Sequence, residues 1–180
     1  WERTVLVRGG EVKDVSAQLF PVDLKSEQIT SSNVDKVFFS QNGDYIFYTI
    51  LSSDIESEIG IWKLRIIRNI FDFGKINAEK LSIDNEIITL MKTNDYDISI
   101  AQDSSKLLIS GVNKNFYKLI DTSNSTNNID LKLELGYLPD DAQWFNNSTE
   151  LIIEKGSVIY EYNIASKAKT LINLNENNVS

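Results

Sequence analysis

A pair of strands that recurs three times constrains the fold of this chain more than any single residue does. In each copy a polar turn leads into an apolar strand, and a short strand of aromatic and aliphatic residues follows. The copies comprise residues 39–46 with 61–64, residues 100–108 with 116–119, and residues 144–152 with 159–162. Such a repeat predicts one supersecondary unit stacked three times, because each unit needs a neighbour to cover its apolar face.

The spacing of the copies indicates units of four short strands. About 43 residues separate Phe116 from Ile159, and about 55 separate Ile61 from Phe116, with the excess in an expected insertion at residues 69–78. A period of about 40 to 45 residues is typical of a β-propeller blade. We therefore expect an all-β fold of four-stranded antiparallel blades that form a partial or small propeller. A β-sandwich has the same local signals and is the alternative.

The 180 residues are expected to form one domain with four consecutive parts. Residues 1–31 are expected to be a partial blade or a hairpin, with strands at residues 4–7 and 17–22 around Gly9-Gly10. The three blades are then assigned to residues 34–90, which include the insertion, to 95–133 and to 141–173. Further strands are expected at residues 59–67, 80–83 and 129–133.

The third copy carries a resemblance to a known family. A strand ending in Trp144-Phe145 and a polar turn precede residues 158–164, Val-Ile-Tyr-Glu-Tyr-Asn-Ile. This order is similar to the blade of TolB-type propellers, in which a W-S-P-D-G-K turn leads to an I-Y-x-x-D-x-x-x-G strand. The Pro-Asp pair of that turn is absent from all three copies, Gly43 alone retains its glycine, and Asn163 replaces the Asp. The resemblance covers about residues 34–172 and implies a propeller fold without a defined active site; such propellers often serve as protein-binding platforms or gate a hydrolase.

Charge argues against two classes of partner. The formal net charge is −8, whereas a protein that binds nucleic acid needs a concentrated basic surface. The nearest approach to a basic cluster is Lys63, Arg65 and Arg68, whose spacing on a strand predicts that they face solvent. Anionic membrane surfaces are disfavoured for the same reason, and no apolar run reaches the length of a membrane span.

The sequence contains neither cysteine nor histidine. Ser-His-Asp, Cys-His and His-zinc chemistry therefore cannot be built from this chain alone. We expect no cofactor and no enzymatic activity.

Carboxylates remain as candidates for chemistry. Asp54, Glu56 and Glu58 alternate along a loop and could supply calcium ligands. Because no glycine-turned calcium loop is present, the pattern favours a solvated loop, and we expect no metal site. The pairs Asp95/Asp97 and Asp140/Asp141 have the composition of an acid and a base, but each precedes an expected strand, where Asp commonly satisfies backbone donors. Among the aromatic residues, Trp62, Tyr117 and Tyr160 recur at equivalent places, which favours packing between blades over a carbohydrate platform.

These observations favour a non-enzymatic binding or scaffold module that contacts a protein partner through loops at one face of the blades. A propeller associated with a hydrolase, or a carboxylate-based glycosidase, is one alternative, and a structural subunit of a surface assembly is another. The sequence starts at Trp1, which we interpret as the end of a domain freed of an N-terminal anchor. An extracytoplasmic location is therefore expected, with a cytoplasmic domain as the alternative.

Overall fold

The computed structural model describes residues 30–66, 78–123, 127–145 and 147–172, together with two strands near the N-terminus. Its regular structure is mainly β, with three four-stranded antiparallel sheets whose strands pair in chain order and a separate two-stranded sheet near the N-terminus. The first sheet contains β3 (Lys36–Phe39), β4 (Tyr45–Ile50), β5 (Gly60–Arg65) and β6 (Ala78–Lys80). The second contains β7 (Tyr96–Ile100), β8 (Lys106–Gly111), β9 (Tyr117–Asp121) and β10 (Ile129–Asp130). The third contains β11 (Asp141–Trp144), β12 (Glu150–Lys155), β13 (Val158–Asn163) and β14 (Lys169–Leu171).

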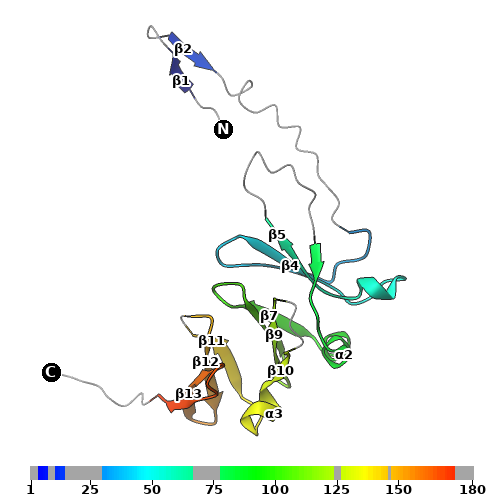
Figure 1. The fold of residues 1–180 in the computed structure, drawn as a ribbon, viewed down its shortest axis with the longest axis vertical. Coiled ribbons are helices and arrows are strands. Elements are labelled where there is room, and N and C mark those ends of the chain that lie inside the picture. Colours follow the sequence, from blue (N-terminus) through cyan, green and yellow to red (C-terminus); the bar gives the residue numbers. More distant parts are fainter. Residues whose placement is uncertain are drawn as a thin grey trace, which may run out of the picture.

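The second sheet lies between the other two and is buried on both faces (Figure 1). Along β8, Leu107 and Ile109 belong to a core shared with the first sheet, whereas Leu108 belongs to a core shared with the third. Successive residues of a strand point to opposite faces, so a strand covered on both sides is apolar throughout. This position explains why residues 107–109 form a continuous buried run.

One turn geometry recurs between the first two strands of the three four-stranded sheets. The side-chain oxygen of Asn42 accepts a hydrogen bond from the backbone N–H of Asp44 at 3.0 Å. Asp103 accepts from Ser105 at 2.9 Å, and Asn147 accepts from Thr149 at 2.9 Å. Each is an Asx turn, in which the side chain takes the place of a backbone acceptor. The three turns predicted from the sequence are therefore confirmed.

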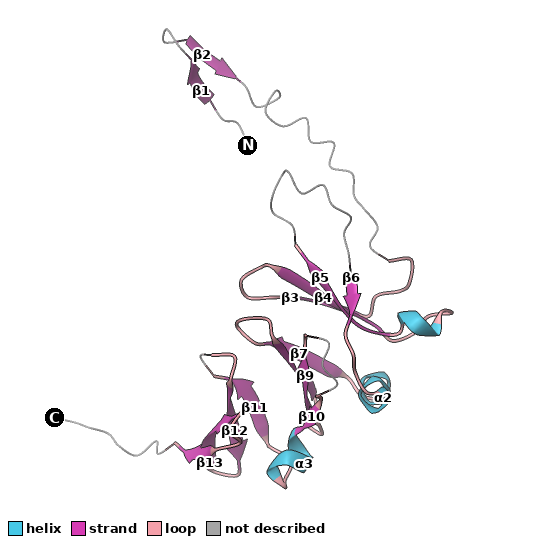
Figure 2. Cartoon of the chain, viewed as in Figure 1, coloured by secondary structure: helices cyan, strands magenta, loops and turns pink. Residues whose placement is uncertain are grey.

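Two α-helices were not predicted. Helix α2 (Asn85–Thr93) connects the first sheet to the second, and α3 (Leu131–Leu135) connects the second to the third (Figure 2). Helix α2 buries Ile87 and Met91, which lie four residues apart and so share one face of the helix. The expected strand at residues 129–133 was wrong beyond Asp130, because that side chain accepts hydrogen bonds from two backbone N–H groups and starts α3.

Three further strand predictions need correction. The partner of β1 (Thr4–Val7) is β2 (Glu11–Asp14) and not the run at 17–22, which lies outside the described residues. The outer strand of the first sheet occupies residues 78–80 in place of 80–83, and β5 is shorter than the expected 59–67. The expected insertion at 69–78 lies outside the described residues except for Ala78.

The solvent-facing assignment of Lys63 was also wrong. Its ammonium group donates to the hydroxyl of Thr122 in the second sheet at 3.2 Å and lies 4.4 Å from the ring centroid of Tyr45. The register of β5 places Lys63 and Ile61 on the face that packs toward the second sheet. Arg65 is exposed as expected, and Arg68 lies outside the described residues. None of the helices in the described regions is long and apolar enough to span a membrane.

Candidate functional site

The first strands of the three sheets, β3, β7 and β11, line one groove, which we call the inner groove. Each is an edge strand of its sheet, and the groove between them encloses about 530 Å³. Its lining is mainly aromatic, aliphatic and small polar, and includes two carboxylates: Phe38, Phe39, Gln41, Asp97, Ile98, Ser99, Ile100, Ser110, Asp141, Ala142, Gln143 and Trp144. Phe39 is 66% exposed. Exposure of a large apolar side chain to water is energetically unfavourable.

Contacts between sheets hold the walls of the inner groove in place. The indole N–H of Trp144 on β11 donates to the carbonyl oxygen of Ser99 on β7 at 3.1 Å. On the other side, the ammonium of Lys36 on β3 pairs with Asp95 at 3.1 Å and lies 4.4 Å from the ring centroid of Tyr96. The three edge strands are therefore connected through polar contacts as well as through the two cores.

Each of the two aspartate pairs that the sequence indicated is divided in the structure, with one member in the groove lining and the other outside it. Asp97 and Asp141 line the inner groove, whereas Asp95 and Asp140 are not among its lining residues. Asp140 accepts hydrogen bonds from Lys155 and from the backbone N–H of Gly156, each at 2.7 Å, and these contacts lower its pKa. Neither predicted pair therefore enters the groove as a unit.

Asp141 is held as a carboxylate. Partial burial alone would raise its pKa, but a 2.7 Å hydrogen bond from Gln143 and a 3.1 Å ion pair with Lys114 outweigh that effect and lower it. A general acid must carry a proton at working pH. Asp141 is consequently suited to binding a positive group and poorly suited to donating a proton.

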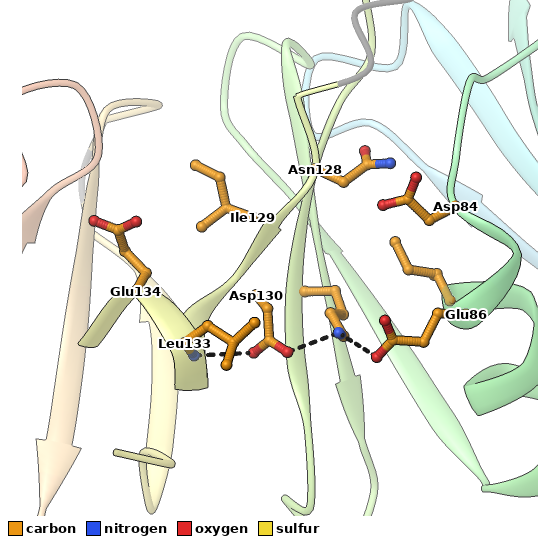
Figure 3. Close-up of a pocket in the computed structure, with 9 residues that line it drawn as sticks. Asp84, Glu86, Asn128, Ile129, Asp130, Leu133 and Glu134 are labelled. Carbon is orange, nitrogen blue, oxygen red and sulfur yellow. Dashed lines mark hydrogen bonds and ion pairs between the residues drawn. The ribbon is translucent and has the colours of Figure 1, made fainter. Parts of the chain in front are cut away.

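A second cavity, of about 370 Å³, lies between α2, β9 and α3, and a buried lysine is among the residues that line it. Lys118 on β9 is only 6% exposed. Its ammonium donates to Asp130 at 2.8 Å and to Glu86 at 2.9 Å, and the two carboxylates approach the nitrogen from opposite sides (Figure 3). Burial opposes the charge on Lys118, but the two carboxylates outweigh it and raise its pKa.

This lysine cluster, Lys118 with Glu86 and Asp130, connects three elements. Glu86 lies in the first turn of α2, and Asp130 caps the first turn of α3 through its other oxygen. The carboxylate of Glu134 is turned away from the cluster (Figure 3) and pairs with Lys167 at 3.0 Å. Sequence reasoning missed the cluster because its three members are far apart in the chain, and no local spacing brings them together.

The calcium candidates lie on the loop between β4 and β5. Glu56 and Glu58 belong to the short 3₁₀ helix η1 (Glu56–Glu58), which Asp54 precedes. The carboxylate of Glu58 accepts hydrogen bonds from the hydroxyls of Ser32 and Ser53. Across the described parts of the chain, no three acidic side chains gather in a way that could hold a metal ion. The interpretation favoured by the sequence, a solvated loop without a metal ion, stays a prediction.

The recurring aromatic residues have different surroundings. Tyr117 is buried in the core between the second and third sheets, and Tyr160 packs against that core from the third sheet. Trp62 instead stacks on Tyr48, with ring centroids 6.2 Å apart and an interplanar angle of 6°. Its indole N–H donates to the carbonyl oxygen of Glu58 at 2.8 Å. Two of the three residues therefore pack between sheets, as the sequence predicted.

Comparison of the sequence with known protein families and with curated proteins found no match to either. The function must therefore be argued from the geometry of the two sites.

Proposed function

We propose that this chain is a non-enzymatic binding module with a propeller-like arrangement of sheets, and that the inner groove is its contact surface for a protein partner. The observation that carries the proposal is the groove itself. Three edge strands line a concavity of about 530 Å³, and Phe39 in its wall is largely exposed. Six of its twelve lining residues are aromatic or aliphatic and six are polar, so the groove offers both apolar contacts and hydrogen-bonding groups to a ligand.

The packing of equivalent faces supports the propeller-like part of the proposal. Ile98 and Ile100 of β7 pack toward the first sheet, and Ala142 of β11 packs toward the second. In a propeller the first strand of each blade lines the centre and every blade packs on its predecessor in this way. The TolB-type resemblance of the sequence agrees with this arrangement.

An extended peptide is the class of partner that edge strands favour. An edge strand has backbone donors and acceptors that no neighbouring strand uses, and peptides bind such edges through main-chain hydrogen bonds. Side chains of the peptide would then enter the groove beside Phe39 and Trp144. The proposed contact surface therefore lies along the strands, in addition to the loops expected from the sequence.

The alternative of a carboxylate-based glycosidase has less support. Such an enzyme needs one carboxyl group as acid and a second as nucleophile or base. Of the two carboxylates in the groove, Asp141 has a lowered pKa and a cationic partner. This environment favours ionic binding.

A library of displayed random dodecapeptides, selected on the wild-type protein, tests the proposed function. Selected peptides are expected to bind the Phe39→Ser variant at least tenfold more weakly, because the variant removes an apolar wall of the groove. Leu133→Ser is the matched control, since Leu133 is 80% exposed on α3 and away from the groove. Failure to select any peptide, or equal binding to Phe39→Ser, would refute the groove as the contact surface.

A further inference from the structure

The charge of the inner groove has one sign. Two of its lining residues, Asp97 and Asp141, are carboxylates, and none of the described residues that line it is a lysine or arginine. The whole chain has the same sign, with a formal net charge of −8. A cleft lined by charges of one sign concentrates their field. The groove is therefore electrostatically complementary to a cation.

Asp97 is the carboxylate available to such a cation. Asp141 already has Lys114 at 3.1 Å. Asp97 is exposed, and within the described parts of the chain it has no ion-pair partner; its Oδ1 accepts only the backbone N–H of Ile98, at 2.9 Å. Its neighbour across the ladder is Ser110, which also lines the groove.

Aromatic rings in the same groove suit a guanidinium group better than an ammonium group. Phe38, Phe39 and Trp144 all line it, and the Trp144 ring is oriented by its hydrogen bond to Ser99. Arginine combines a planar cation that stacks on aromatic faces with donors that bind a carboxylate. A site with one carboxylate and aromatic rings can therefore both pair with a guanidinium group and stack against it.

We infer that the inner groove selects an extended peptide that carries arginine. This inference rests on the proposed function. The guanidinium pairs with the carboxylate of Asp97 and lies against the aromatic wall, while the peptide backbone follows the edge strands. The assignment predicts that affinity depends on the positive charge and not only on the size of the side chain.

Two labelled peptides test the inference. One has the sequence Ala-Leu-Arg-Val-Arg-Leu-Ala, and the other has citrulline in place of both arginines, which keeps the shape and removes the charge. Fluorescence anisotropy at low salt should give about five- to tenfold tighter binding of the arginine peptide. Raising the salt concentration should reduce this difference.

The Asp97→Asn variant should bind both peptides with equal, weak affinity. Asp54→Asn is the matched control, because it removes one carboxylate charge as well, from an exposed residue on the loop between β4 and β5 that does not line the groove. It should keep the preference for arginine. Equal binding of the two peptides to the wild-type protein, or no measurable binding of either, would overturn the arginine assignment. The library selection decides the proposed function separately, since selected peptides without arginine would leave that function intact.

Discussion

The hydroxyl of Tyr96 donates a hydrogen bond to Oδ2 of Asp35 across 2.6 Å. Tyr96 begins β7 in the second sheet, and Asp35 immediately precedes β3 in the first. The same hydroxyl lies 2.7 Å from the hydroxyl of Thr49 on β4. A single buried oxygen thus joins β4 and the residue before β3, in the first sheet, to the first strand of the second sheet.

Replacement of Tyr96 by Phe should lower the free energy of unfolding by about 1–2 kcal/mol, because it removes two hydrogen bonds at a residue that is only 2% exposed. Urea denaturation followed by circular dichroism measures the change. Tyr45→Phe is the control, since the Tyr45 ring contributes to packing and to the contact with Lys63. An equal loss in both variants would argue against a special role for the Tyr96 hydroxyl.

Ionisation of Tyr117 should make the folded protein less stable at alkaline pH. Burial, together with the nearby Asp141 and Asp140, raises the pKa of Tyr117 to about 12. Since an unfolded tyrosine titrates near pH 10, the folded state favours the neutral phenol. The stabilisation is complete below about pH 10 and is lost as the pH rises through the folded pKa. The urea midpoint of the wild-type protein should therefore fall between about pH 10 and 12, and that of Tyr117→Phe should fall less steeply. Parallel slopes would contradict this assignment.

The lysine cluster should contribute to stability at neutral pH. Lys118→Met leaves Asp130 without its cation, and we expect a loss of about 1–3 kcal/mol in the free energy of unfolding. Lys167→Met, which breaks the exposed pair with Glu134, should cost less than about 1 kcal/mol. The double variant Lys118→Met with Asp130→Asn should recover part of the loss, because the carboxylate that then remains without its cation, Glu86, is largely exposed to water.

The lysine cluster also predicts that the stability of the protein decreases at low pH. Burial would raise the pKa of Asp130, but Lys118 and the backbone of α3 lower it overall. Its contribution is thus present above the ordinary pKa of an aspartate and is lost as the pH falls through the lowered value. Lys118→Met should show a smaller loss of stability on acidification from pH 5 to pH 2. A steeper loss in the variant would be inconsistent with the pairing.

The sequence was informative where one local signal controlled the structure. The three turns depend on Asn42, Asp103 and Asn147, whose side chains act within two residues of themselves, and such signals can be read from the chain. Helix α2 was missed because the β-branched residues at 87–89 favour strands, and burial against the second sheet overrides that preference.

Features that depend on several elements could not be predicted. Lys118, Glu86 and Asp130 come from β9, α2 and the start of α3, and only the packing of the sheets brings them together. The inner groove has the same origin. Its aspartates were recognised, but Asp95 and Asp140 lie just before β7 and β11 and pair with Lys36 and Lys155, whereas Asp97 and Asp141 lie on the strands that line the groove.

Ser104 should be replaceable by glycine with a gain in stability. It adopts φ = 61° in its turn, where the equivalent residue of the first sheet is Gly43 at φ = 67°. A side chain in this left-handed region has a steric cost that glycine avoids. Ser104 is also 1% exposed, and its hydroxyl has no hydrogen-bond partner within the described structure.

Ser104→Gly should therefore raise the free energy of unfolding by about 1 kcal/mol, measured by urea denaturation. The reverse change, Gly43→Ser, should lower it by a similar amount. Ser105→Gly serves as the control, because Ser105 lies beside the same turn without a left-handed conformation, and the added backbone freedom of its unfolded chain should make this variant less stable. A loss of stability in Ser104→Gly equal to that in Ser105→Gly would show that the side chain of Ser104 fills space that the turn requires, and that this contact outweighs the relief of the backbone.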